Sequence, residues 1–219
     1  MGESNNEKLK RVKKITKLLY QAYPESKCSL TYNNAHELLV ATILSAQCTD
    51  HRVNIVTGNL FKKYESLEDF AYCDITALSM DIHSCGYHNQ KAKSIQGSSL
   101  MILEEFNGKV PHAMEDLIRL PGVGRKTANC VLVYAYEKPA IPVDIHVHRI
   151  SNRLGLVQTK NPEETEFELM KIIPKKLWLD INETFVKYGQ NICKPITPMC
   201  KVCKIKNSCK YYKTKNASL

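Results

Sequence analysis

The sequence lacks the segments that would send a chain into or across a membrane. None of its 219 residues form a secretory signal, a targeting extension or an apolar run long enough to span a bilayer. Strand-like alternation is scarce, and no internal repeat, low-complexity stretch or flexible linker stands out. These absences argue against membrane, repeat and all-β proteins. We therefore predict a helical protein of a reducing, cytoplasmic compartment with no membrane partner.

Acidic residues are missing from the end of the chain, because residues 193–219 contain none. Seven lysines lie there instead: Lys194, Lys201, Lys204, Lys206, Lys210, Lys213 and Lys215. Together with a net charge of +9, they predict attraction to nucleic-acid phosphate and strong salt dependence. A solvated basic tail is the alternative. With 43% apolar residues, the chain can bury a full core as one unit or as two small domains.

Four of the nine cysteines stand close together near the C-terminus, with the spacing C-x6-C-x2-C-x5-C: Cys193, Cys200, Cys203 and Cys209. Without signs of secretion, this density predicts a metal site rather than disulfides. The spacing alone does not choose the metal. A structural zinc usually takes two C-x2-C pairs and this segment has one, which disfavours zinc without excluding it. Free surface thiols are the remaining alternative.

Residues 120–126 read L-P-G-V-G-R-K inside an otherwise helical stretch. Such a turn between two helices exposes backbone N–H groups at the start of the second helix, and these suit a phosphate. Lys126 falls in that helix's first turn, where the dipole and burial near Arg125 should lower its pKa and leave a nucleophilic amine. We expect no side chain to fit at Gly122 or Gly124. As alternatives, Gly-x-Gly turns are common, and lone helical lysines are usually solvated.

Asp144 follows Lys126 by eighteen residues, in the phrase I-P-V-D-I-H-V-H-R. Its carboxylate could shuttle protons during sugar chemistry on a nucleic acid. It could also be the N-cap of a helix ending near Leu154, and the two roles are compatible. Four alternating apolar residues suggest a strand instead: Ile141, Val143, Ile145 and Val147. Because no partner strand is evident, we favour the helix cap.

Helix signals dominate the rest of the chain, so the predicted fold class is all-α. Residues 38–44 form an apolar run that suits a central, buried helix. Asn34 with Glu37 resembles a capping box in front of it. The hairpin helices are expected at about 113–119 and 125–136. Further helix starts are expected at Thr49, Ser66, Asp74, about Asn89 and Asn161.

The run L-P-G-V-G-R-K-T-A-N at residues 120–129 resembles the helix-hairpin-helix of the endonuclease III family of DNA glycosylases. I-L-S-A-Q-C-T-D at 43–50 and G-Y-H-N-Q-K-A at 86–92 are similar to two further motifs of that family, and the resemblance extends from about Lys8 to Cys209. It implies a two-domain fold. A six-helix barrel would span residues 28–139, with the hairpin at about 113–137. Residues 1–27 and 140–219 would form an iron–sulfur domain.

The same resemblance implies a bifunctional DNA glycosylase and abasic-site (AP) lyase of base excision repair, acting on oxidised pyrimidines or abasic sites in double-stranded DNA. Lys126 would be the nucleophile and Asp144 the catalytic carboxylate, with strand cleavage 3′ to the abasic site by β-elimination. A [4Fe–4S] cluster would be bound by Cys193, Cys200, Cys203 and Cys209. DNA contacts are implied for Gln47, Tyr87, His88, Gly122, Val123, Gly124, Arg125 and Lys194.

Gln47 would fill the gap left by the everted nucleotide, and Tyr87 would wedge into the opposite strand. For Gln47, the alternative is a helix-end residue that bonds the backbone. The chain departs from the family pattern at His88, where tyrosine is frequent, and at Ile145, where threonine is usual. We expect the protein to associate with the nucleoid. We also expect a monomer, because no apolar stripe is left over after the helices pack.

Two other functions compete with this interpretation. The related monofunctional adenine glycosylases usually lack a lysine at the position of Lys126 and carry an extra C-terminal domain, which argues against them. A non-enzymatic DNA-binding protein could use the hairpin for phosphate and a structural zinc for stability. The colour of the purified protein separates zinc from an iron–sulfur cluster.

Overall fold

The computed structural model describes residues 3–24 and 28–217. Every regular element in these ranges is a helix, which confirms the predicted all-α class. The chain divides into two compact units: residues 28–138, here called the hairpin unit, and residues 1–27 with 139–219, here called the cysteine unit. None of the helices in the described ranges is both long and apolar enough to cross a membrane.

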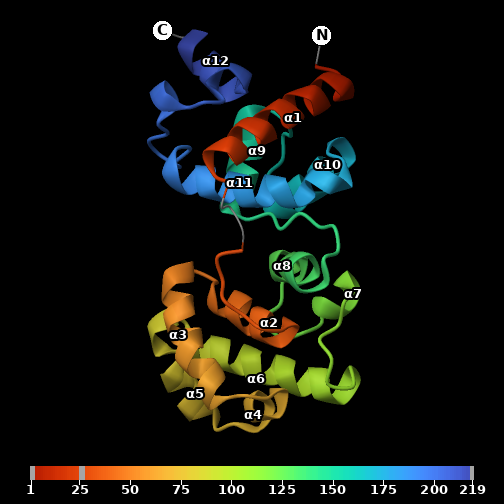
Figure 1. Ribbon diagram of the computed structural model, residues 1–219, viewed down its shortest axis with the longest axis vertical. Helices are drawn as coiled ribbons and strands as arrows, with labels where there is room; N and C mark the ends of the chain where they lie inside the picture. Colours follow the sequence, from red (N-terminus) through yellow and green to blue (C-terminus); the bar gives the residue numbers. More distant parts are fainter. Residues whose placement is uncertain (1–2, 25–27, 218–219) are drawn as a thin grey trace. The chain divides into compact units, whose positions relative to one another are not determined.

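The hairpin unit is built around one buried helix. Its elements are α2 (Ala35–Leu44), α3 (Asp50–Lys63), α4 (Leu67–Tyr72), α5 (Ile75–Asp81), the 3-10 helix η1 (His83–Cys85), α6 (His88–Glu105), α7 (Met114–Leu117) and α8 (Arg125–Tyr136). All residues of α2 from Leu38 to Leu44 are buried, as the apolar run predicted. Helix α2 contacts α3, α6 and α8, and α6 in turn supports α4 and α5 (Figure 1).

The cysteine unit has its own core. Its elements are α1 (Asn5–Ala22), α9 (Ile145–Leu154), α10 (Pro162–Ile172), η2 (Lys175–Leu177), α11 (Trp178–Asn191), η3 (Cys200–Val202), η4 (Lys206–Ser208) and α12 (Lys210–Ala217). Helix α9 contacts α10, α11 and α12, and α1 lies along α11 (Figure 1). Apolar residues such as Ile15, Ile150 and Phe185 meet in the middle. Each such side chain contributes about 1.5–3 kcal/mol by leaving water.

Side-chain caps start the helices at the predicted positions. The residues whose side chains accept a backbone N–H of the first turn are Asn34, Thr49, Ser66, Asp74 and Asn161. The Asn34–Glu37 pair differs from the expected capping box, because the Glu37 carboxylate accepts from the Asn33 N–H at 2.7 Å. Helix α6 begins at His88, one residue earlier than expected.

Candidate functional site

The first helix of the hairpin is shorter than expected. It spans Met114–Leu117 rather than residues 113–119. From Arg119 on, the amides bond carbonyls three residues back, from Arg119 N to Asp116 O and from Leu120 N to Leu117 O, both at 3.2 Å. This tightening is consistent with Pro121, which disfavours helical geometry in the residue before it.

The hairpin turn packs on small residues of α6. Gly122 has a φ of +77°, and a Cβ added there would lie 2.5 Å from the Cβ of Ser94. The Ser98 hydroxyl donates to the Pro121 carbonyl at 2.7 Å. The expectation that Gly122 tolerates no side chain is therefore confirmed, by backbone conformation and by contact. At Gly124 an added Cβ would meet nothing within 4 Å in the protein alone, so the expectation for the phosphate-bound turn stays a prediction there.

Helix α8 begins directly after this turn, with Gly124 as its N-cap. Gly124 has no side chain, so no side-chain cap covers the positive end of α8. The Val123 amide donates to Leu120 O at 3.0 Å, within the turn. A phosphate contact by the Val123 amide, which the sequence predicts, would therefore compete with an existing hydrogen bond.

Lys126 is the second residue of α8, and its side chain is exposed. The expected burial near Arg125 is therefore wrong for the protein without DNA, although the predicted place in the first turn is confirmed. The positive charge of Lys126 also affects the pKa of the Cys28 thiol. Burial raises the pKa of Cys28 to about 11, and the positive charge of Lys126 is among the weaker influences that lower it.

Asp144 is the N-cap of α9, as predicted. Its Oδ1 accepts the amides of His146 and Val147, both at 2.8 Å, which fixes the orientation of the half-buried carboxylate. The strand-like alternation does not continue through this point, because Ile145 is 67% exposed while Val147 is fully buried. The predicted helix cap is therefore confirmed, and the strand is not formed.

An arginine that sequence reasoning missed connects the start of α9 to the first cysteine. Arg149 donates from Nε to Cys193 O at 3.1 Å and from a terminal nitrogen to Gly189 O at 3.2 Å. Helices α9 and α11 are close here, since a Cβ at Gly189 would lie 2.6 Å from His146 Nδ1. Only the i, i+3 spacing of His146 and Arg149 on one helix face could have suggested this link.

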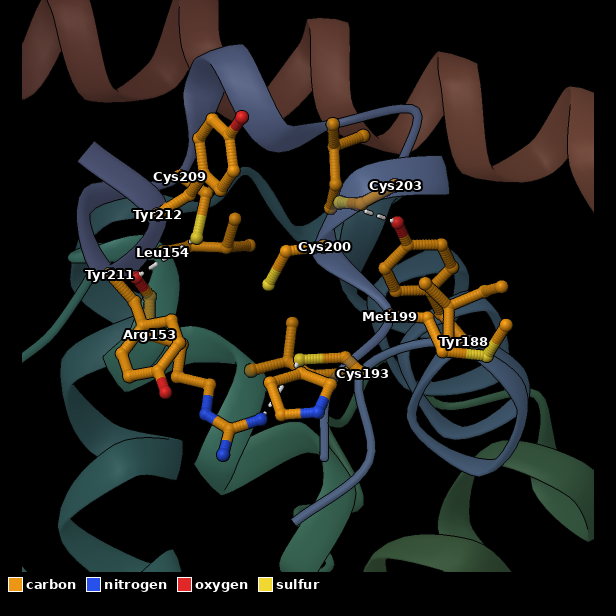
Figure 2. A pocket seen from close by; sticks show the side chains of 14 residues that line it. Arg153, Leu154, Tyr188, Cys193, Met199, Cys200, Cys203, Cys209, Tyr211 and Tyr212 are labelled. Atoms are coloured by element: carbon orange, nitrogen blue, oxygen red, sulfur yellow. Dashed lines mark hydrogen bonds between the residues drawn. The ribbon is translucent and has the colours of Figure 1, made fainter. Parts of the chain in front are cut away.

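The four predicted cysteines line one cavity, together with Arg153 and Tyr188 (Figure 2). The Tyr188 hydroxyl donates to Cys203 Sγ at 2.9 Å, and an Arg153 nitrogen donates to Cys193 Sγ at 3.4 Å. Burial raises the pKa of Cys209. The structure thus brings together all four residues that the spacing singled out.

Thiols around a shared cavity, with hydrogen bonds directed at sulfur, form the kind of surroundings that iron–sulfur clusters use. Among the described residues, no three His, Cys, Asp or Glu side chains are arranged to hold a single metal ion. Zinc bonded to cysteine would need sulfurs about 2.3 Å from one centre. Four cysteine sulfurs that line one cavity are a donor set that fits an iron–sulfur cluster.

Gln47 and Tyr87 share an uncommon backbone conformation. Their φ angles are +54° and +49°, in the left-handed region that few non-glycine residues adopt. Both side chains are exposed, Tyr87 by 67%. The DNA contacts predicted for Gln47 and Tyr87 remain predictions.

The other predicted DNA contacts remain predictions. The His88 ring is half-buried, and its Nδ1 lies 2.7 Å from the Ser79 hydroxyl. The Lys194 side chain is exposed, and its carbonyl accepts from Arg153 at 2.7 Å. Arg125, in the first turn of α8, is half-buried.

Sequence reasoning also missed Lys91, which lies within the segment G-Y-H-N-Q-K-A. Lys91 is 5% exposed and is in contact with three backbone carbonyls of the hairpin unit. The available signal was its position beside Ala92 and Ile95 on the apolar face of α6, where a charged residue requires partners.

The chain is similar to known proteins in sequence and in structure. Residues 40–175 match the family described as HhH-GPD superfamily base excision DNA repair protein. The endonuclease III of Synechocystis sp. is 45% identical over 203 residues, which cover 92% of this chain and 93% of that protein.

Two solved structures are similar over nearly the whole chain. A non-covalent endonuclease III–DNA complex has a TM-score of 0.90 at 37% identity and covers 99% of this chain and 100% of its own. A trapped endonuclease III–DNA covalent intermediate has the same TM-score at 38% identity, with 98% and 100% coverage. The chain belongs to the HhH-GPD superfamily of base excision DNA repair proteins and, within it, to the endonuclease III family.

Proposed function

We propose that this protein removes oxidised pyrimidines from double-stranded DNA and then cleaves the abasic strand, as a bifunctional glycosylase and AP lyase. The observation that carries the proposal is Lys126, an exposed amine in the first turn of a helix whose N-cap is a bare glycine. That helix end attracts phosphate through its dipole. A DNA backbone bound there would bring a sugar within reach of the amine.

The chemistry requires the damaged nucleotide to leave the stack, which costs less for a weakly paired base. The amine of Lys126 then attacks C1′. A carbon–nitrogen bond forms as the glycosidic bond breaks, and the departing base takes the electron pair and a proton. Asp144 accepts the proton of the attacking amine and stabilises the cationic sugar. The nitrogen lone pair then forms a C1′=N double bond as the C1′–O4′ bond breaks and O4′ takes up a proton, which opens the sugar ring and gives a Schiff base. Loss of a proton from C2′ of this Schiff base expels the 3′ phosphate oxygen and cuts the strand.

The remaining site residues would hold the DNA. The amides of Gly122 and Gly124 and the side chain of Arg125 would bind phosphate at the start of α8, and the turn would have to open for the Val123 amide to join them. Gln47 would fill the gap left by the everted nucleotide, and Tyr87 would stack in the opposite strand. His88 would contact the lesion strand. In the cysteine unit, Lys194 would contact a backbone phosphate.

A [4Fe–4S] cluster bound by Cys193, Cys200, Cys203 and Cys209 would serve a structural and electrostatic role. It would fix the loop of residues 194–199, which Arg153 already holds by its hydrogen bond to Lys194 O. It supplies no step of the reaction. Iron and sulfide analysis, together with broad visible absorbance of the purified protein, distinguishes it from zinc.

The test of the nucleophile is borohydride reduction in the presence of DNA that contains an abasic site. We expect a covalent protein–DNA adduct with the unmodified protein and none with Lys126→Ala. Asp144→Asn should form the adduct more slowly. Lys109→Ala, which removes another exposed lysine of the hairpin unit, is the matched control and should behave normally. A normal adduct from Lys126→Ala would show that another amine attacks.

The lesion class and the oligomeric state need their own measurements. Duplexes that differ only in one oxidised or undamaged pyrimidine should be cleaved only when the base is oxidised. Cleavage of the undamaged duplex at the same rate would contradict the proposed substrate. Sedimentation at assay concentration should give a monomer of 24.9 kDa.

A further inference from the structure

The reaction described above makes no use of the buried ammonium group of Lys91. This residue lies in the first turn of α6 and is 5% exposed. Its Nζ donates to Leu44 O at 2.8 Å, to Ala46 O at 2.7 Å and to Cys85 O at 2.9 Å. A lysine ammonium has three N–H donors, so all of them are used.

The three carbonyls belong to two separate segments. Leu44 is the last residue of α2, and Ala46 stands immediately before Gln47. Cys85 is the last residue of η1, two positions before Tyr87. Lys91 therefore joins the end of α2 to the end of η1, each just before an exposed residue.

Electrostatics favour a cation at this place. The last carbonyls of a helix carry partial negative charge and lack partners within the helix, so an ammonium satisfies them at the end of α2. Hydrogen bonds from a charged donor are also stronger than neutral ones. Burial lowers the pKa of Lys91, and the hydrogen bonds to the three carbonyls offset part of the cost of burying its ammonium group.

Each segment that Lys91 joins leads into a residue with a constrained backbone. Gln47 and Tyr87 both have positive φ, and Tyr87 makes no side-chain cap at the start of α6. A non-glycine residue keeps such a conformation only where its surroundings impose it. The bonds to Ala46 and Cys85 fix the backbone within two residues of each.

We propose that Lys91 is a positioning residue for opening DNA, which holds Gln47 and Tyr87 together in the places from which they enter the base stack. This inference rests on the proposed function, in which Gln47 fills the gap left by the everted nucleotide and Tyr87 stacks in the opposite strand. Lys91 itself contacts no DNA and no reacting atom.

The positioning role separates two substrates. A duplex with an oxidised pyrimidine requires the stack to be opened and filled, whereas a single-stranded abasic site offers Lys126 its sugar without any stack. Loss of Lys91 should therefore slow the first reaction and spare the second. A purely structural role would slow both.

The experiment compares Lys91→Met, which has no donor, with Lys91→Gln, which keeps two N–H donors without charge. Lys93→Met is the matched control, because Lys93 is an exposed lysine of the same helix. We expect Lys91→Met to lower kcat/KM on the damaged duplex on the order of 100-fold, as misplaced contacting groups do. Lys91→Gln should lose less. Adduct formation with single-stranded abasic DNA should match the unmodified protein for all three variants.

A second comparison uses the double variant Gln47→Ala with Tyr87→Ala. In that background, Lys91→Met should cause little further loss on the duplex, because the residues it positions are gone. An undiminished further loss, or equal loss on both substrates, would overturn the proposal. If Lys91→Met shows no cooperative thermal transition, Lys91→Gln takes its place in both comparisons.

The two proposals fail in different ways. Absence of a Lys126-dependent adduct with the unmodified protein on double-stranded DNA that contains an abasic site would refute the proposed function. A normal adduct, combined with an unchanged duplex rate in folded Lys91→Met, would refute the positioning role alone.

Discussion

The two glycines of the hairpin turn should respond differently to the same substitution. Gly122→Ala places a methyl group 2.5 Å from the Cβ of Ser94, at a φ of +77°. Gly124→Ala adds the same methyl group in open space, at a φ of −93°. We therefore expect the first change to destabilise the protein and the second to affect chiefly its binding of DNA.

The magnitudes follow from the geometry. A left-handed alanine costs about 1–2 kcal/mol and an overpacked methyl about 1–3 kcal/mol, so Gly122→Ala should lower the free energy of unfolding by about 3 kcal/mol. This corresponds to a fall in Tm on the order of 10 °C. At Gly124, two opposing effects nearly cancel. Alanine lowers the entropy of the unfolded chain, which stabilises the protein, but it is a weaker N-cap than glycine. The free energy of unfolding should therefore change by no more than about 1 kcal/mol.

Thermal denaturation and DNA-binding titrations provide the assay. Gly124→Ala should melt like the unmodified protein but bind abasic-site duplex more weakly, because its methyl group occupies the space proposed for phosphate. Ser94→Gly removes the Cβ that the added methyl group would overlap. Combined with Gly122→Ala, it should restore the stability lost to that overlap, but not the stability lost because alanine is held at a positive φ. Equal melting of the two single variants would refute the reasoning from contact and conformation.

Three further predictions concern single side chains. Asparagine is as good an N-cap as aspartate, so Asp144→Asn should keep the free energy of unfolding within about 0.5 kcal/mol while slowing single-turnover cleavage; a large loss of stability would contradict this. Burial lowers the pKa of His36 from 6.5 to about 4, so the unfolded chain binds the proton first as pH falls. The free energy of unfolding should therefore be highest above pH 6.5 and fall by about 3 kcal/mol toward pH 4, a dependence that denaturant titrations should find missing in His36→Gln. Tyr188→Phe removes the donor to Cys203 Sγ, so visible absorbance should decay faster under a chelator; an unchanged decay would mean that this bond does not protect the site.

Local signals explain what the sequence could predict. A cap such as Asn34 or Asp144 acts on amides two or three residues away, so it can be found without knowing the fold. The same holds for Gly122, whose positive φ is a property of the turn itself. These short-range effects were sufficient to place the start of α8 and of α9.

Features that depend on tertiary packing were less accessible. The expected burial of Lys126 was wrong, because exposure depends on what covers the first turn of α8 and no local pattern reports that. The four cysteines were identified from their spacing, but the donors aimed at them come from distant segments. Arg153 lies 40 residues before Cys193, and Tyr188 lies 15 before Cys203.

Lys91 shows how such a residue could be found in other sequences. Its acceptors lie 47, 45 and 6 residues before it, so no window of sequence contains the whole arrangement. Its position can still be recognised, because a lysine on the apolar face of a helix must find acceptors or lose its charge. Unpaired carbonyls occur mainly at the C-terminal ends of helices. A lysine on the buried face of a helix start therefore predicts that this start lies against the end of another helix, as Lys91 of α6 bonds Leu44 O at the end of α2.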